Sequence, residues 1–255
     1  MTLYFIGLGL NNEKDITLKG LETIKKCDFV YLENYTSILQ CSIKDLEKQY
    51  NKKIILANRE LVEKKAEQTI LKDAKDKDVA FLVIGDPMCA TTHIDLLLRA
   101  KKQGIQIKAI NNASIISAIG ITGLEVYKFG KVTSIPFDNE NIKAPYYVLQ
   151  SNLKNNLHTL FLLDLDPSTQ TKSDSSFENR FLTIKDAIEY LIKQGMSKDH
   201  LCLGCARIGS DNFLIKKGKA FELKNINFGK PPYCLVIPSK LHFIEEEALE
   251  QWKIK

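Results

Sequence analysis

Short hydrophobic runs alternate with amphipathic segments over the first 110 residues of the chain. The hydrophobic runs predict strands over residues 3–7, 29–32, 54–57, 79–84 and 106–110. Apolar residues at helical spacing predict helices over residues 17–27, 42–50, 62–75 and 93–103. The run 79–84 is apolar at every position, which is typical of a strand covered on both faces. The alternation predicts an α/β fold with a parallel sheet between helices.

The rest of the chain has a different pattern. Strands are predicted over residues 132–135, 159–163, 201–208, 213–217 and 233–237, and helices only over 146–156 and 183–194. The polar stretch 166–179 predicts an exposed loop. We therefore expect a second, α+β domain with a mixed sheet. The pattern changes near Asn111, so the predicted domains are residues 1–111 and 112–255.

Several predicted helix ends carry recognisable signals. Ser42 with Asp45, and Thr183 with Asp186, have the spacing of a capping box, in which a hydroxyl and a carboxylate satisfy each other's backbone N–H groups. Gly104 and Gly195 follow the last apolar residues of their segments, as glycine commonly does after a helix.

Composition and charge narrow the class of protein. Of the 255 residues, 44% are hydrophobic and 26% are charged, which excludes intrinsic disorder. No apolar run approaches the roughly 18 residues of a membrane helix, and no basic segment precedes the first apolar run, so neither a membrane association nor a signal peptide is expected. The net charge of +5 comes from scattered lysines, and this pattern does not indicate nucleic-acid binding.

The six cysteines predict no metal site. Cys202 and Cys205 form a C-x-x-C within a predicted strand, without the second pair that a zinc site needs. We interpret these residues as structural thiols. Reduced thiols are typical of cytoplasmic proteins, so we expect a cytoplasmic location.

Some residues that follow predicted strands are candidates for ligand binding. Gly7 and Gly9 follow the first strand, at the place of a dinucleotide-binding fingerprint. Asn12 stands where that fingerprint has its third glycine, which favours a simple tight turn. Glu33 ends the second strand, where either a ribose-binding acid or a solvated carboxylate is expected.

The loop from Gly85 to His93 is more informative. It follows the most apolar strand, at the strand end where open α/β sheets bind ligands. Gly85 permits close backbone approach, and Pro87 keeps Asp86 out of helical space. The alternative is a loop with Asp86 as a turn residue, Thr91 or Thr92 capping the next helix and His93 at the helix start.

Taken together, these segments resemble diphthine synthases, a family within the tetrapyrrole methylases. The resemblance covers nearly the whole chain in order. It rests on the segments Gly7-Leu-Gly9-Leu10, Gly85-Asp86-Pro87, Ala90-Thr-Thr-His93, Ser114-Ile115, Gly120-Ile-Thr-Gly123-Leu124, Tyr127-Lys-Phe-Gly130, Leu157-His-Thr159, Ala206-Arg207-Ile-Gly209 and Lys240-Leu-His242.

The resemblance implies two α/β domains with S-adenosyl-L-methionine in the cleft between them, and a homodimer. The implied reaction is repeated methylation of the modified histidine of translation elongation factor 2, on which diphthamide is built. The implied cofactor contacts are Leu10, Asp86, Cys89, Ser114, Ile115, Leu163, Ile208 and Tyr233. Two of these depart from the family pattern, which often has Val, Gly or Phe at position 89 and commonly has His at position 233.

Segments 32–39 and 166–179 resemble the eukaryotic enzymes, which favours four methylations, the last forming a methyl ester. The sequence assigns no catalytic residue, because a sulfonium methyl is already activated and mainly needs orientation. Two alternatives are a small-molecule precorrin methylase and a non-catalytic protein that docks on a translation factor.

Overall fold

The computed structural model describes residues 1–89, 93–165 and 181–254. Contacts divide the chain into two compact units. The N-terminal unit comprises Met1–Ala118 with the short segment Gly209–Asp211, and the C-terminal unit comprises Ile119–Ile208 with Asn212–Lys255. Each unit has its own sheet and its own core.

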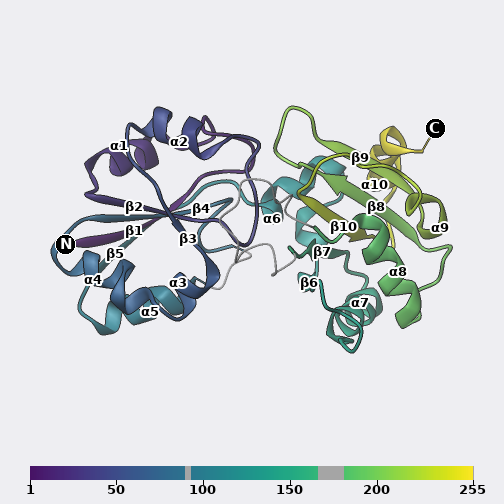
Figure 1. Ribbon diagram of the computed structural model, residues 1–255. Helices are drawn as coiled ribbons and strands as arrows, with labels where there is room; N and C mark the ends of the chain where they lie inside the picture. The colour runs from purple at the N-terminus through teal and green to yellow at the C-terminus, as the bar shows by residue number, and fades with distance from the viewer. Residues whose placement is uncertain (90–92, 166–180, 255) are drawn as a thin grey trace. The chain divides into compact units, whose positions relative to one another are not determined.

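The N-terminal unit is built on a five-stranded parallel sheet, as its sequence predicts (Figure 1). Its strands are β1 (Thr2–Gly7), β2 (Phe29–Glu33), β3 (Ile55–Ala57), β4 (Val79–Val83) and β5 (Gln106–Ile110). They lie in the order β3-β2-β4-β1-β5, so the fully buried β4 is central. All five carboxyl ends therefore meet at one edge of the sheet, and the loops that follow β1 and β4 are neighbours.

Helices cover both faces of this sheet (Figure 1). Helices α1 (Leu18–Lys26) and α2 (Ile43–Tyr50) pack on one face, over Ile6, Leu32 and Leu82. The other face, with Phe5 and Phe81, packs against α3 (Arg59–Glu63), α4 (Ile70–Asp76) and α5 (Ile94–Lys102). The sheet is thus the middle layer of three, which explains why β4 is apolar throughout.

The prediction of one helix over residues 62–75 is wrong. The structure has α3, then the short 3₁₀ turn Ala66–Gln68, then α4. Thr69 departs from helical geometry with φ −130° and ψ −98°, and its hydroxyl donates to the Lys65 carbonyl. Threonine competes for backbone hydrogen bonds in this way, which disfavours it inside helices.

Both predicted capping boxes are confirmed. The Ser42 hydroxyl accepts from the Asp45 N–H at 3.2 Å, and the Asp45 carboxylate accepts from the Ser42 N–H at 2.9 Å. The same reciprocal pair joins Thr183 and Asp186. Gly104 and Gly195 have left-handed backbones, with φ of +74° and +116°, as expected of glycines that end helices.

The C-terminal unit holds a mixed sheet in the order β6-β7-β10-β8-β9, which confirms the predicted mixed sheet. Its strands are β6 (Thr133–Ile135), β7 (Thr159–Leu163), β8 (Leu201–Ala206), β9 (Leu214–Lys219) and β10 (Tyr233–Ile237). Only β6 and β7 run parallel. Helices α7 (Ala144–Lys154) and α8 (Ile184–Gln194) match the predictions, whereas α9 (Ala220–Leu223) and α10 (Phe243–Leu249) were not predicted.

A buried carboxylate, Glu245 of α10, joins three distant segments of this unit. One oxygen accepts from the Glu125 N–H at 3.0 Å and contacts His158 Nε2 at 2.9 Å. The other accepts from the His242 N–H and from the Lys128 ammonium. Because His158 Nδ1 accepts from the Ser239 N–H, Nε2 carries the proton and donates to Glu245. The family-like segments around residues 128, 158 and 242 thus converge on one side chain.

The single tryptophan of the chain also belongs to the C-terminal unit. Its indole N–H donates to the Thr122 carbonyl at 2.9 Å, and its ring packs edge-on against Phe213. Trp252 therefore holds the end of the chain against the segment that opens this unit.

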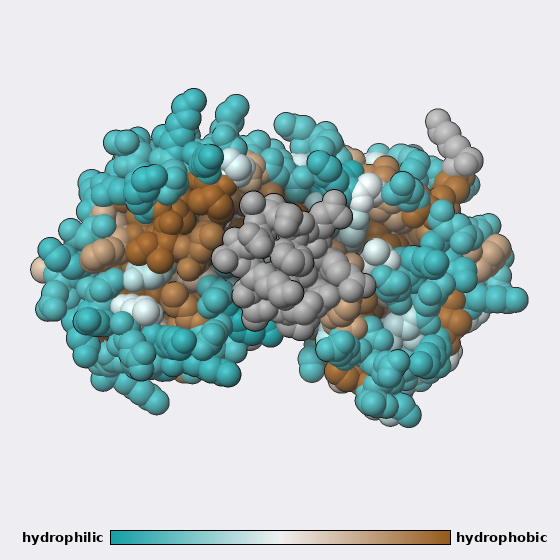
Figure 2. Space-filling model, in the orientation of Figure 1, coloured by the Kyte–Doolittle hydropathy of each residue, from teal (hydrophilic) through white to brown (hydrophobic). Residues whose placement is uncertain are grey.

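The surface of the N-terminal unit has a hydrophobic area where β3 forms the sheet edge (Figure 2). Ile55 and Leu56 of β3 are 39% and 46% exposed.

Within the described residues, no helix has both the length and the apolar character that crossing a bilayer requires.

Candidate functional site

The loops after β1 and β4 are bonded to each other at the carboxyl edge of the parallel sheet. Gly9 and Gly85 exchange backbone hydrogen bonds of 3.3 and 2.8 Å, and both have positive φ. A Cβ on Gly7 would lie 2.6 Å from the Gly85 carbonyl oxygen and 2.8 Å from Asn112 Cβ. Glycine is therefore required at position 7 for these loops to approach so closely.

Asp86 anchors the second of these loops. Its Oδ1 accepts from the Met88 N–H at 2.8 Å, and its Oδ2 accepts from Asn111 Nδ2 and the Asn112 N–H, both at 3.0 Å. The Cys89 thiol also bonds this carboxylate. Only 4% of Asp86 is exposed. Burial acts to raise the pKa of Asp86, but the hydrogen bonds outweigh it and hold that pKa below its usual range.

Asn112 joins this loop to the loop after β1. Its side-chain amide donates to the carbonyls of Gly7 and Asp15, each at 3.0 Å. Asp15 in turn accepts from the N–H groups of Leu10 and Asn11. Sequence reasoning missed Asn111, Asn112 and Asp15, because their partners lie in other segments. The only available signal was an Asn pair directly after a strand.

Four of the five predicted contacts in the N-terminal unit are brought together by these loops. A Cβ built on Gly85 would meet Leu10 Cδ2 at 3.8 Å and Ser114 Cα at 3.9 Å. The Cys89 thiol bonds both Asp86 and the side chain of Ser114. The fifth, Ile115, follows Ser114 and begins the short helix α6 (Ile115–Ala118).

The other three predicted contacts lie in the C-terminal unit. Leu163 ends β7, and the buried Ile208 follows β8. Tyr233 begins β10 and pairs with Ala206 of β8. The Tyr233 hydroxyl donates to the Gly229 carbonyl, and Tyr233 borders a cavity of about 420 Å³ with the start of α8 and residues 224–229.

Two further residues discussed from the sequence are buried. Glu33 is fully buried, so the expectation of a solvated carboxylate there is wrong. It accepts from the N–H groups of Tyr35 and Thr36 and from the Thr36 hydroxyl. His93 is the N-cap residue directly before α5, which agrees with its predicted place at the helix start, and it is only 1% exposed. Burial lowers the pKa of His93 to about 4, so the imidazole is neutral. Residues 91 and 92, the predicted caps, lie outside the described residues.

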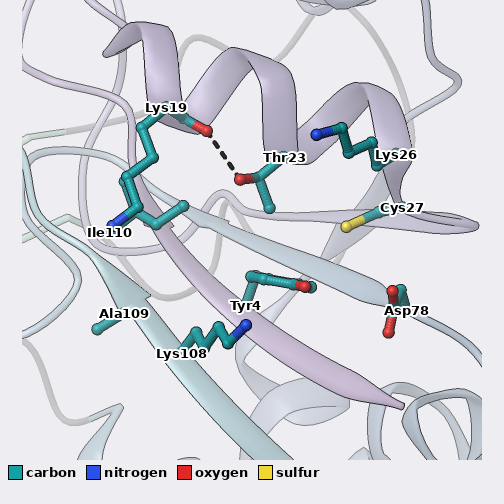
Figure 3. A pocket seen from close by; sticks show the side chains of 9 residues that line it. All are labelled: Tyr4, Lys19, Thr23, Lys26, Cys27, Asp78, Lys108, Ala109 and Ile110. Carbon is teal, nitrogen blue, oxygen red and sulfur yellow. Dashed lines mark hydrogen bonds between the residues drawn. The ribbon is translucent and has the colours of Figure 1, made fainter.

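A separate cavity of about 370 Å³ lies between α1 and strands β1 and β5 (Figure 3). Lys19 and Lys26 of α1, Lys108 of β5 and Tyr4 of β1 line it. These lysines are exposed and therefore hydrated. Asp78, which precedes β4 at the amino end of the sheet, also lines this cavity.

The cysteine pair of the C-x-x-C motif lies inside β8. Cys202 and Cys205 are fully buried, and Cys205 bonds the thiol of Cys234 on β10. Burial raises the pKa of the Cys202 thiol to about 12. Among the described residues, no group of three or more His, Cys, Asp or Glu side chains is arranged to hold a metal ion.

Comparison with known proteins decides the family. A family model described as Tetrapyrrole (Corrin/Porphyrin) Methylases matches residues 2–224. A diphthine methyl ester synthase from Dictyostelium discoideum is 43% identical, and the match covers 100% of this chain and 99% of that protein. This chain belongs to the diphthine synthase family of tetrapyrrole methylases. It is therefore a methyltransferase of diphthamide biosynthesis.

Archaeal relatives and solved structures agree with this family. A diphthine synthase from Methanocella arvoryzae is 44% identical, with 97% of this chain and 96% of that protein covered. A crystal structure of a diphthine synthase superposes with a TM-score of 0.88 at 37% identity, covering 99% of this chain and 96% of that chain. The identities to the archaeal synthase and to the methyl ester synthase, 44% and 43%, are nearly equal.

Proposed function

We propose that this chain transfers methyl groups from S-adenosyl-L-methionine to the modified histidine of translation elongation factor 2. The proposal rests on the family and on one structural observation, the bonded loops that bring Leu10, Gly85–Asp86 and Ser114 together at the carboxyl edge of a parallel sheet. Ligands of open α/β sheets bind at this edge.

The residues present fit such a cofactor. Gly85 lacks a side chain where a Cβ would enter the space beside Leu10 and Ser114. Leu10 and Ile115 offer apolar contacts, whereas Cys89 and Ser114 offer polar atoms. Asp86 contributes a negative charge that suits a cationic sulfonium. We further propose that Leu163, Ile208 and Tyr233 bind the same cofactor.

The cofactor supplies an activated methyl group, and the chain has to orient it toward the acceptor lone pair. The attacking nitrogen must be unprotonated. Glu33 and His93 are too buried to touch a substrate. Neither residue is therefore the base.

We propose four methylations, the last forming an ester. Segment 32–39, which resembles the eukaryotic enzymes, supports this number; segment 166–179 lies outside the described residues. We also propose a cytoplasmic homodimer, from the reduced cysteines and the family resemblance.

The test uses the purified protein, methyl-labelled S-adenosylmethionine and elongation factor 2 that carries the unmethylated precursor. Label should enter the factor, and mild alkali should release about one methyl in four because esters hydrolyse. Factor with an unmodified histidine is the control and should stay unlabelled. Alkali-stable label would contradict the fourth methylation. If the protein methylates a precorrin and leaves the factor unlabelled, it is the small-molecule precorrin methylase. If it binds the factor but not S-adenosylmethionine, it is the non-catalytic docking protein.

A further inference from the structure

Arg207 has an unexpected backbone conformation. Three non-glycine residues of the described chain have positive φ: Asn51, Asn156 and Arg207, the last with φ +53°. Asparagine tolerates this left-handed region, but arginine has no such preference and is strained there. Glycine would fit the same backbone at lower cost. A strained residue of this kind indicates that its side chain has a specific task.

The guanidinium of Arg207 bonds three backbone carbonyls. Its Nε donates to the Asn212 carbonyl at 3.1 Å, and its Nη1 donates to the carbonyls of Phe228, at 2.9 Å, and Lys230. The Arg207 N–H also donates to the Pro232 carbonyl at 2.8 Å. One side chain therefore fastens the turn after β8 to the bend before β10. A planar guanidinium suits such a bridge because its donors are fixed in a fork.

Both ends of this bridge adjoin residues proposed to bind the cofactor. Ile208 directly follows Arg207. Tyr233 begins the strand after the bend, and its hydroxyl donates to Gly229, between the two carbonyls that Arg207 holds. The bend thus fixes the Tyr233 hydroxyl, and Arg207 fixes the bend.

We propose that Arg207 is a positioning residue that presets Ile208 and Tyr233 for S-adenosylmethionine. The inference rests on the proposed function. Arg207 acts through these two neighbours and not on the reacting atoms. Its loss should therefore weaken cofactor binding while leaving the methyl-transfer step nearly unchanged, because preorganisation lowers the cost of binding.

The decisive variant is Arg207→Gly, which tolerates the left-handed backbone and removes the side chain with its guanidinium. We expect the Kd and KM for S-adenosylmethionine to rise roughly tenfold, while kcat stays within about twofold. Amide exchange over residues 228–234 should quicken, and that over α8 should not. Added guanidinium ion at millimolar concentration should restore part of the affinity, whereas equal sodium chloride should not. Asn156→Gly, the same backbone replacement at the turn before β7, is the matched control and should leave the Kd unchanged.

Arg207→Lys keeps the charge but offers a point donor in place of the fork, so its Kd should also rise. This variant decides the matter if Arg207→Gly fails to fold. If folded Arg207→Gly binds S-adenosylmethionine with the wild-type Kd, the inference is wrong but the proposed function stands. If Arg207→Gly does not fold, a wild-type Kd in Arg207→Lys has the same meaning. A fall in kcat with an unchanged KM overturns the inference as well. A wild-type chain that binds no S-adenosylmethionine overturns the proposed function and this inference together.

Discussion

At the scale of single residues, the pKa of a buried carboxyl group depends on the hydrogen-bond donors around it. Glu33, Asp86 and Glu245 are all nearly inaccessible. Burial raises the pKa of Glu33, and its three hydrogen bonds do not compensate. For Glu245, burial acts in the same direction, but hydrogen bonds from His242, Lys128, Glu125 and His158 lower its pKa to about 2. Glu245 has four donors, one of them the charged Lys128 ammonium, whereas the three hydrogen bonds of Glu33 come from uncharged groups.

The lowered pKa of Glu245 predicts a specific loss of stability in acid. A group whose pKa is lower in the folded state than its ordinary value of 4.5 stabilises the fold above that value, and this contribution is lost as the pH falls toward about 2. The shift corresponds to roughly 3 kcal/mol of unfolding free energy. Urea unfolding from pH 5 to pH 3 should therefore show a steep decline in the wild type and a shallower one in Glu245→Gln.

The neighbouring Glu246→Gln on the exposed side of α10 serves as the control and should follow the wild-type decline. Equal slopes for Glu245→Gln and the wild type would show that Glu245 does not carry this pH dependence.

At the scale of elements, helix caps should matter only where the side chain makes the cap. The Thr183 hydroxyl accepts from the Asp186 N–H at the start of α8, whereas Thr69, the N-cap residue before α4, makes no capping bond with its side chain. Thr183→Ala should lower the free energy of unfolding by about 1 kcal/mol. Thr69→Ala should change it much less. Urea denaturation measures both, and similar losses at the two sites would contradict the role of the cap.

The sequence predicts these elements wherever the signal is local. Ser42, Thr183, Gly104 and Gly195 act on neighbours in the chain, so their roles follow from spacing. Helix α10 was not predicted, because its capping box pairs Glu245 with His242 in place of the usual Ser, Thr or Asp, and because Phe243 and Ile244 are 66% and 51% exposed while Glu245 is buried. In α10 the charged residue faces inward and the apolar residues face solvent, because partners from distant segments form hydrogen bonds with Glu245. Asp86 was predicted from its loop, but its Asn111 and Asn112 partners follow β5 and depend on the sheet order.

At the scale of the whole molecule, cofactor binding should stabilise the folded chain. S-adenosylmethionine at a hundredfold excess over its Kd adds about 2.7 kcal/mol, which should raise Tm by roughly 5–10 °C for a chain of this size. Asp86→Asn should reduce the rise, because it removes the negative charge and replaces one of the two acceptor oxygens with an NH2 donor. Asp78→Asn, at a carboxylate that accepts from the Thr2 N–H at the other end of the sheet, should preserve it. Differential scanning calorimetry measures both, and an unchanged Tm in the wild type would contradict the proposed cofactor.

The position of Trp252 makes intrinsic fluorescence selective for one half of the protein. Its indole is bonded to Thr122 and packed on Phe213, both in the C-terminal unit, and the chain has no other tryptophan. Emission excited at the tryptophan band therefore follows the melting of that unit, whereas far-ultraviolet circular dichroism follows the helices of both. Two separated transitions would reveal a partly unfolded species with one intact sheet, and coincident transitions would show that the halves unfold as one cooperative system.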